Sequence, residues 1–339
     1  MRTGVAVIGI GMWGVRMGEA ARRAGLDVVT CFARDARRRA AAAERLNCES
    51  APSLEAAIEH PRVGGVLVVT PNEAHADQAI AAAERGRHVF VEKPIADTVA
   101  QAERIRDTCA AAGVQLMVGH AFRRLGAARR AKELVDAGRL GTVVLAEATF
   151  SLPGSLPGHA WRAHRETNPG GPLMQLGIHH VDTLACWLGP IARSTGRFAR
   201  VVTPADIDDV GVICLEFASG ALGVISGSYV SPKTFAIRLQ GTDAILDLRT
   251  DLSIWPDAQR MDAATTLTLS GEAVGFEERD MLAEELAEFG RCIREGVAPE
   301  TGAEEGIAAL RAISDALALP LRGREAHVIA SFDAEVAAP

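Results

Sequence analysis

The hexapeptide Gly-Ile-Gly-Met-Trp-Gly at residues 9–14 limits the possible folds of this chain more than any other feature. It follows the short apolar run 4–9, which is typical of a buried strand, and it opens a segment that predicts a helix over 13–24. Glycines at this spacing let a chain turn tightly from a strand into a helix that packs close to it. The start of the chain therefore predicts a βαβ unit, the building block of a parallel sheet.

The same motif predicts a binding site for a dinucleotide. Gly9 permits the tight turn, Gly11 lets a pyrophosphate approach the backbone, and Gly14 allows close packing of the helix. Unpaired N–H groups at the start of the helix would then face the anion. We expect Met12 and Trp13, inside this loop, to contact the cofactor as well.

Strands and helices alternate from residue 4 to about residue 120. Further strands are expected at 28–32, 63–70, 88–93 and 114–120, and further helices at 35–46, 73–86 and 98–112. This alternation is the pattern of a parallel α/β sheet. We expect residues 1–122 to form a dinucleotide-binding Rossmann domain with a doubly wound parallel sheet.

The pattern changes in the second part of the chain. An extended run at 143–150 and a glycine- and proline-rich loop at 153–172 precede a helix over 174–188, and strands then follow one another through short turns. These strands are expected at 209–217, 221–229, 235–241 and 245–249, and further helices at 126–137, 278–295 and 302–319. Such a succession of strands predicts antiparallel pairing. We expect residues 123–339 to form a substrate-binding and oligomerisation domain, an α+β unit with a large, mainly antiparallel open sheet.

Length and composition narrow the classes of function. A chain of 339 residues exceeds the usual size of one hydrophobic core, which favours two domains. The net charge of −7 argues against a nucleic-acid partner, and no apolar run is long enough to span a membrane. The chain starts without a signal-peptide pattern, and its six scattered cysteines include no C-x-x-C pair. We therefore expect a cytoplasmic protein without a metal site.

The end of the second predicted strand bears on the choice of cofactor. NAD enzymes place an acidic residue about 20 residues after the glycine motif, where it bonds the ribose 2′-OH. Ala33 stands there instead and Arg34 follows it, and an arginine can pair with the 2′-phosphate of NADP. We expect NADP, with NAD as the alternative if Asp35 reaches the 2′-OH rather than capping the next helix.

Four further segments, combined with the glycine motif, resemble the Gfo/Idh/MocA oxidoreductase family, the relatives of glucose–fructose oxidoreductase and inositol 2-dehydrogenase. The segments are LVVTPNEAH at 67–75, HVFVEKPI at 88–95, VGHAFRR at 118–124 and GGPLMQLGIHHVD at 170–182. The resemblance covers nearly the whole chain. It implies a dinucleotide domain followed by an open-sheet domain, and dimers or tetramers formed through that sheet.

Residues at the carboxyl ends of the predicted strands are expected to line the cofactor site, because ligands bind at that edge of open α/β sheets. The resemblance adds a histidine near the cofactor. The set comprises Thr70, Pro71, Asn72, His75, Glu92 and Lys93. Asn72 can also cap the helix that follows it.

Lys93 and His179 are the expected catalytic residues. Only three of the 36 basic residues are lysines, and the resemblance implies that Lys93 contacts the reacting hydroxyl or the nicotinamide ribose, where its charge would stabilise a developing alkoxide. His179 is the expected general acid or base. Gln175, one helical turn earlier, stands where relatives carry an aspartate, and we expect it to contact the substrate. Asp182 is expected to orient His179 or to fix a turn.

The loop before this helix is where the resemblance implies substrate contacts. It contains His159 and, next to each other, Trp161 and Arg162, and an aromatic face beside an arginine suits a sugar or a ring carboxylate. Arg123, just after the last strand of the first domain, is expected to line the same cleft or to brace the domains.

Together these features predict an NAD(P)-dependent oxidoreductase that moves a hydride between nicotinamide and a secondary alcohol or ketone of a sugar, cyclitol or related cyclic polyol. Two alternatives stay open: a dihydrodiol dehydrogenase acting on a carbocycle, and a dinucleotide-binding sensor with weak catalysis. A homodimer or homotetramer is expected because both faces of the strands at 209–249 carry apolar side chains, unless the tail at 320–339 covers the open face.

Overall fold

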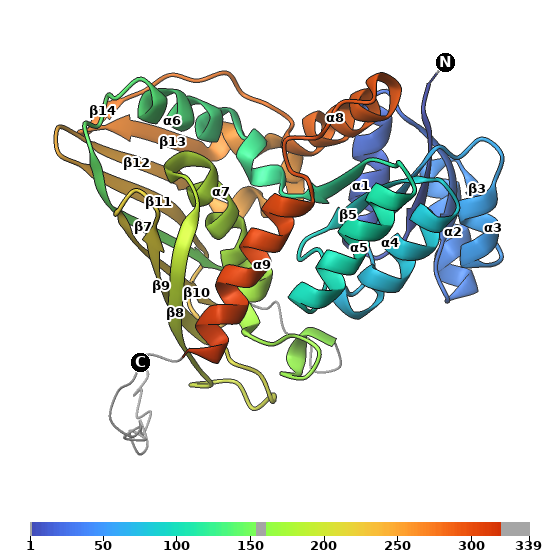
Figure 1. Cartoon of the computed structure of the whole chain (residues 1–339), viewed down its shortest axis with the longest axis horizontal. Helices are drawn as coiled ribbons and strands as arrows, with labels where there is room; N and C mark the ends of the chain where they lie inside the picture. The colour runs from blue at the N-terminus through green and yellow to red at the C-terminus, as the bar shows by residue number, and fades with distance from the viewer. Residues whose placement is uncertain (1, 154–160, 320–339) are drawn as a thin grey trace, which may run out of the picture.

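The computed structural model describes residues 2–153 and 161–319 and contains two sheets, one from each half of the chain (Figure 1). The first sheet has six strands in the order β3-β2-β1-β4-β5-β6, and every neighbouring pair is parallel. Its strands are β1 (Gly4–Ile8), β2 (Asp27–Phe32), β3 (Glu49–Ser50), β4 (Gly65–Val68), β5 (His88–Glu92) and β6 (Leu116–Gly119). Its helices are α1 (Met12–Arg23), α2 (Ala36–Leu46), α3 (Leu54–Glu59), η1 (Asn72–Ala74), α4 (His75–Glu84) and α5 (Val99–Ala111). The expected doubly wound parallel sheet is confirmed.

The turn between β1 and α1 requires two of its glycines. Gly9 has a φ of 91°, in the region that only glycine adopts easily. A Cβ on Gly14 would lie 1.8 Å from the carbonyl oxygen of Gly9, so only glycine lets α1 start this close to β1. The N-terminus of α1 is thereby held at the carboxyl edge of the sheet.

The second sheet has eight strands in the order β14-β13-β12-β11-β7-β10-β9-β8, and of its pairs only β7 with β10 is parallel. Its strands are β7 (Val143–Ser151), β8 (Ile191–Ala199), β9 (Val210–Phe217), β10 (Leu222–Ser228), β11 (Thr234–Gly241), β12 (Ile245–Thr250), β13 (Thr265–Leu269) and β14 (Glu272–Ala273). The helices of this half are α6 (Gly126–Asp136), α7 (Ile178–Leu188), α8 (Met281–Glu295) and α9 (Ala303–Ala318). The large, mainly antiparallel sheet is therefore confirmed.

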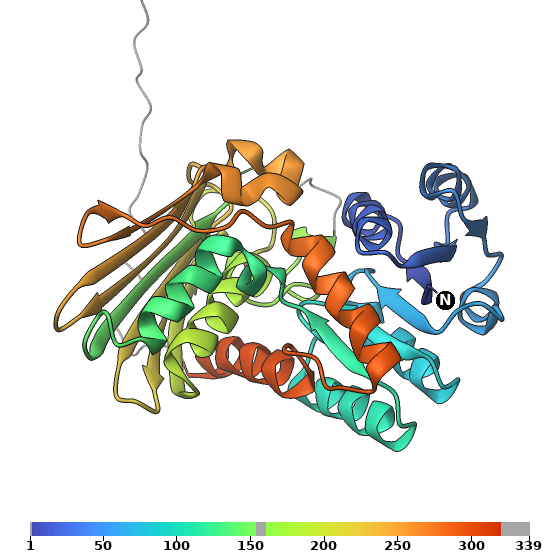
Figure 2. The same ribbon diagram turned by 90° about the horizontal axis from the view of Figure 1, so that it is seen from above.

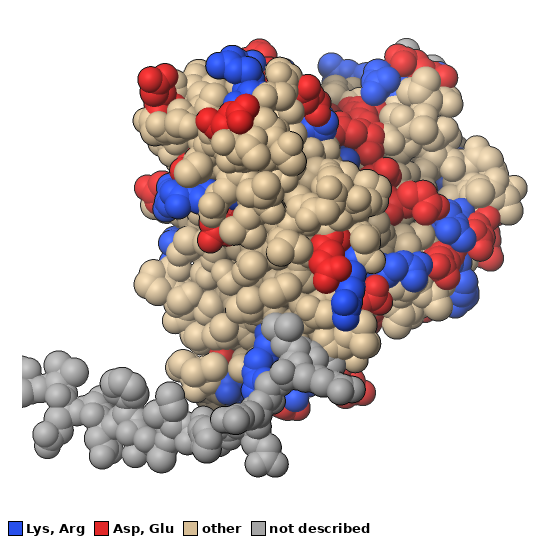
Figure 3. All heavy atoms as spheres, turned by 60° about the vertical axis from the view of Figure 1, so that its left-hand side comes forward, with Lys and Arg blue, Asp and Glu red and all other residues tan. Residues whose placement is uncertain are grey.

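Helices cover one face of this second sheet. In Figures 1 and 2, α6, α7 and α9 lie on the same side of it. Along β9, Ile213 and Leu215 point to the covered side and are buried, whereas Val212 and Cys214 alternate with them and are half-buried. On the molecular face of Figure 3, acidic and basic side chains are intermixed beside a wide area without charged residues. Among the described residues, no helix is long and apolar enough to cross a bilayer.

Four short elements, α3, β3, β13 and β14, were not predicted. Three others also differ from the sequence-based expectation. Strand β8, at one edge of the sheet, was not predicted. Arg193 and Arg197 are exposed along it, and its sequence lacks a clear alternation of apolar and polar residues. The segment η5 (Leu252–Ala264), a run of 3₁₀ turns, lies where no element was predicted. The predicted helix over 174–188 begins with a π turn, Leu173–Gly177, before α7.

The two halves are not separated by an open linker. The expected boundary at residues 122–123 falls inside the short helix η2 (Ala121–Arg124), which follows β6 directly. Helices α8 and α9, from the second half, pack against α1, α5 and β6 of the first. The division of the chain at residue 122 remains a prediction.

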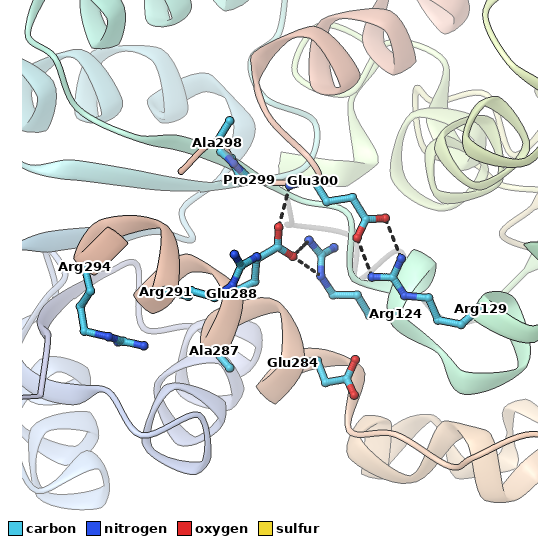
Figure 4. A pocket seen from close by; sticks show the side chains of 10 residues that line it. All are labelled: Arg124, Arg129, Glu284, Ala287, Glu288, Arg291, Arg294, Ala298, Pro299 and Glu300. Atoms are coloured by element: carbon cyan, nitrogen blue, oxygen red, sulfur yellow. Dashed lines mark hydrogen bonds and ion pairs between the residues drawn. The ribbon is translucent and has the colours of Figure 1, made fainter. Parts of the chain in front are cut away.

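A buried ion network holds η2 against α8 (Figure 4). The guanidinium of Arg124 is 1% exposed, and it bonds Glu288 Oε2 at 2.6 Å and Glu285 Oε1 at 3.3 Å. Arg124 also donates to Thr301 Oγ1, which belongs to the segment leading into α9. The network lines one side of a cavity of about 620 Å³, where Arg129 pairs with Glu300. One arginine thus joins three segments: η2, α8 and the stretch that leads into α9.

Removing Arg124 should destabilise the fold strongly, because Glu285 would be left as a buried carboxylate without its cation. We expect Arg124→Ala to lower the free energy of unfolding by about 3–5 kcal/mol. Arg106 is the matched control, since its pairs with Asp107 and Glu304 lie at the surface, and Arg106→Ala should cost under about 1 kcal/mol. Urea denaturation followed by circular dichroism measures both, and equal losses would contradict the expectation.

Candidate active site

The carboxyl ends of the parallel strands bring the expected cofactor residues to one edge of the first sheet. The glycine turn follows β1, residues 70–72 follow β4, Glu92 ends β5, and His120 follows β6. In an open α/β sheet this edge is where ligands bind.

The glycine turn fits a bound pyrophosphate. Helix α1 has no side-chain cap and no acidic residue in its first turn, so its first N–H groups can bond an anion. A Cβ on Gly11 would meet no atom within 4 Å, which leaves open space for a phosphate to approach the backbone. Met12, next in the chain, is 69% exposed. This turn therefore fits the dinucleotide that the motif predicts.

The end of β2 presents arginines rather than a free carboxylate. Asp35 caps α2, because its Oδ1 accepts a hydrogen bond from the backbone N–H of Arg38 at 2.9 Å. Arg34 is exposed, and Arg39 donates to the carbonyl oxygen of Ala33 at 2.7 Å. Of the two alternatives for Asp35, the structure therefore contains the helix cap.

His75 supports the loop after β4 from inside the protein. Its ring is buried, and its two nitrogens lie 2.9 Å from the carbonyl oxygen of Thr70 and 2.8 Å from that of Pro94. Burial lowers the pKa of His75, and the carbonyl oxygens of Pro94 and Thr70 oppose part of this shift. Asn72 is buried at the start of η1 and makes no side-chain cap, which contradicts its suggested capping role. His75 therefore joins the segment around Pro71 to the one that contains Lys93.

Lys93 connects the first sheet to the other half of the molecule. It follows β5, and its Nζ donates to the backbone carbonyl oxygen of Gln175, in the π turn, at 2.8 Å. Burial lowers the pKa of Lys93 to about 8, partly opposed by the negative charge of Glu92. Glu92 accepts hydrogen bonds from Trp13 Nε1 at 2.8 Å and from the backbone N–H of Lys93 at 3.2 Å, and burial raises its pKa.

His179 lies one helical turn after the carbonyl that Lys93 bonds. Its Nδ1 is buried with no hydrogen-bond partner among the described residues, which leaves Nε2 as the nitrogen that can reach a substrate. Burial lowers the pKa of His179 well below its usual value, and the charge of Lys93 adds to this effect. At pH 7 the ring is therefore neutral and able to accept a proton. The structure thus brings the two expected catalytic residues together.

A chain of buried side chains surrounds Gln175. Its Nε2 donates to Asn168 Oδ1 at 3.1 Å, and Asn168 Nδ2 donates to the carbonyl oxygen of Arg162 at 3.0 Å and to the hydroxyl of Tyr229 at 3.3 Å. Trp161 and Arg162 form the short helix η3 (Trp161–Ala163), and the Arg162 guanidinium lies 5.0 Å from the centre of the Trp161 ring. His159 lies outside the described residues.

Of the two roles expected for Asp182, the orientation of His179 is wrong. Asp182 does not orient His179, because both of its oxygens bond Arg123, at 2.6 Å to Nε and 2.7 Å to Nη2. Arg123 is 8% exposed and committed to this pair, which fits the bracing alternative rather than substrate binding. His180, next to His179, is buried and bonds the carbonyl oxygen of Thr149 at 3.0 Å.

An aromatic column links the glycine turn to His179, and its central residue comes from η5. Trp255 stacks on Trp13 with ring centres 6.0 Å apart, and it also stacks on Phe122 at 6.3 Å. Phe122 in turn lies 4.3 Å from the His179 ring. The second half of the chain thus covers the glycine turn with an indole ring.

Several residues of this site were missed in the sequence analysis. They are His120, Phe122, Asn168, Tyr229 and Trp255. His120 is fully buried with its Nδ1 3.9 Å from Asp182 Oδ1. One signal was available: Tyr229 is the only tyrosine in the chain. In the described part of the chain, no three His, Cys, Asp or Glu side chains are grouped so that they could hold a metal.

Comparisons with known proteins agree with this geometry. The model of the oxidoreductase family with an NAD-binding Rossmann fold matches residues 3–120, and that of the GFO/IDH/MocA C-terminal domain matches residues 128–247. The chain is 32% identical to D-xylose 1-dehydrogenase (NADP(+)) 2 of Haloferax volcanii over 83% of its own length and 85% of that protein. It is 27% identical to scyllo-inositol 2-dehydrogenase (NAD(+)) of Bacillus subtilis over 80% and 81% of the two chains.

A solved structure is also similar along nearly the whole chain. It is an oxidoreductase of Desulfitobacterium hafniense described as NADPH-dependent, with a TM-score of 0.89, 34% identity, and coverage of 94% of this chain and 95% of that one. With both family models matched and the Lys93–His179 site formed between the halves they cover, the chain belongs to the Gfo/Idh/MocA family of NAD(P)-dependent oxidoreductases.

Proposed function

We propose that this protein oxidises a secondary alcohol of a cyclic sugar or polyol, or reduces the matching ketone, with NADP as its preferred cofactor. One observation carries the proposal. A charged Lys93 and a neutral His179 lie near each other at the carboxyl edge of the first sheet, where the glycine turn also lies. Relatives named as xylose and scyllo-inositol dehydrogenases support the substrate class. When the cofactor is bound, its nicotinamide ring would accept or donate the hydride.

The protein's own residues would manage the proton and the charge. His179 Nε2 accepts the proton of the substrate hydroxyl, because its ring is neutral at pH 7. The Lys93 ammonium stabilises the negative charge that develops on the same oxygen. Glu92 and the carbonyl oxygen of Gln175 hold the ammonium in position. In the reduction direction the same two residues act in reverse.

Two other functions are compatible with the family. A dihydrodiol dehydrogenase would use the same residues on a carbocyclic diol. A sensor with weak catalysis would bind the dinucleotide without turnover, but the intact Lys93–His179 arrangement favours an enzyme. Turnover of NADP⁺ with any member of a panel of cyclic polyols, or of NADPH with the matching ketones, separates the sensor from the enzymes.

Lys93 should control both the rate and its dependence on pH. The active form is the ammonium, so kcat for alcohol oxidation should fall as the pH rises through about 8, where Lys93 loses its proton. We expect Lys93→Ala to lower kcat by about 10²–10³ while NADPH still binds, because the pyrophosphate contacts lie on the glycine turn. Lys132→Ala, at a surface ion pair, is the control. Steady-state rates from pH 6 to 10 and NADPH fluorescence titration measure these effects, and a Lys93→Ala enzyme with full kcat would exclude Lys93 from the mechanism.

The arginine at the end of β2 should favour NADPH over NADH. Asp35 is engaged as a helix cap, and Arg34 is available for a 2′-phosphate. The double variant Ala33→Asp/Arg34→Ala should reverse the preference, since it supplies a carboxylate for the 2′-OH and removes the cation. Dissociation constants from fluorescence titration test this, and a wild-type protein that binds NADH as tightly as NADPH would count against it.

We also propose a homo-oligomer that buries the open face of the second sheet. Val224 lies opposite Cys214, and Leu222, which is 53% exposed, lies opposite Leu145, so apolar side chains adjoin one another on that face. The tail at 320–339, the suggested alternative cover, lies outside the described residues. Light scattering should give a multiple of 35.8 kDa that falls in Val224→Arg but not in the control Ala41→Arg on α2. A wild-type mass of one chain would refute the oligomer.

A further inference from the structure

We infer that the substrate carries an anionic group, a carboxylate or a phosphate, and that Arg162 binds this group at the rim of the active site. The inference rests on the proposed function and narrows its substrate class from cyclic polyols in general to sugar acids or sugar phosphates.

Arg162 is attached to the catalytic centre by buried hydrogen bonds. Its carbonyl oxygen accepts from Asn168 Nδ2 at 3.0 Å, and Asn168 accepts from Gln175 at 3.1 Å. The carbonyl of Gln175 is the group that Lys93 bonds. Asn168 is fully buried and Gln175 is 4% exposed, so this connection lies in the interior. The backbone of Arg162 is therefore held at a defined place beside the reacting centre.

The guanidinium of Arg162 has no acidic partner among the residues described. Its side chain is exposed and lies over the ring of Trp161, at 5.0 Å from the ring centre. Arg165, three residues later in the same loop, instead pairs with Asp208 at 2.9 Å. Burial is the main influence on the pKa of Lys93 and of Glu92; the charge of Arg162 adds to the lowering of the Lys93 pKa and opposes the raising of the Glu92 pKa.

On the substrate side of the site, Glu92 offsets the charge of Lys93, whereas no described carboxylate pairs with Arg162. Lys93 and Arg162 are both cations there, whereas Gln175, Asn168 and Tyr229 are neutral. Asp182 is fully paired with Arg123. Glu92 is directed to Trp13 and to the backbone of Lys93. An anionic substrate would restore the balance, and a guanidinium over an aromatic ring presents the paired N–H groups that a carboxylate or phosphate accepts.

The test uses matched sugars that differ only in the group at C6, which is neutral in one and anionic in the other two. D-Glucose, D-glucuronate and D-glucose 6-phosphate, and the corresponding galactose series, are assayed as substrates with NADP⁺. We expect an anionic sugar in at least one series to have a kcat/KM about tenfold or more above that of its neutral parent. Comparison of the carboxylate with the phosphate sugar then shows which anionic group Arg162 binds. Arg162→Gln should remove this advantage by raising KM with kcat little changed.

Control variants distinguish binding from a general loss of structure. Arg165→Gln should keep the advantage of the anionic sugar, and Arg162→Lys should keep part of it. In Arg162→Gln the alkaline limb of the pH profile should move to higher pH, because a cation that lowers the pKa of Lys93 is gone. Calorimetry of the same sugars with the NADPH-loaded enzyme measures binding without turnover.

Two results would overturn the inference in different ways. If neutral sugars react best and Arg162→Gln leaves the ratio of neutral to anionic kcat/KM unchanged, the substrate is not anionic, while the oxidoreductase proposal stands. If no sugar in either series reacts or binds, with NADP⁺ or NAD⁺, the inference fails, and the oxidoreductase proposal fails with it if the panel of cyclic polyols and ketones described above shows no turnover either.

Discussion

The hydrogen bond from Lys93 Nζ to the carbonyl oxygen of Gln175 is the interaction on which the active site depends. An ammonium group removed from water needs polar partners nearby, or it loses its proton. Here the partners come from both halves of the chain: Glu92 at the end of β5 and the backbone of the π turn before α7. The catalytic charge can therefore be held only when the two halves are packed together. Packing of α8 and α9 on the first sheet maintains this arrangement.

Burial gives neighbouring groups in this site different protonation states. Lys93 keeps a pKa of about 8 because the charge of Glu92 opposes part of the effect of burial. His179 has no such partner, so its ring is neutral at pH 7. Asp182, three residues later, is matched by the bidentate Arg123 and adds no free charge. A cation from the end of β5 and a neutral base on α7 thus lie near each other, as proton transfer from an alcohol requires.

Much of the fold could be predicted from the sequence, because its signals are local. The glycine turn, the alternation of strands and helices and the hairpin-like strands of the second half all depend on residues close together in the chain. Lys93 and His179 were found through motifs of the same kind. The pairing of Arg123 with Asp182 joins residues 59 positions apart, and no local pattern predicts it. Trp255 was missed because η5 has neither the helical nor the strand period, and Asn168 because it lies in a glycine-rich loop.

The π turn at Leu173–Gly177 has a consequence for how this site arises in evolution. Such a turn contains one residue more than the α-helical turn it replaces, and here it stands at the start of α7. The carbonyl that receives Lys93 lies within that extra turn. A single-codon deletion there would shorten the turn and displace the carbonyl that receives the lysine, while Lys93 and His179 themselves stay in the sequence. Among related chains, a one-residue difference in length at this point would separate those that hold the lysine in this way from those that do not.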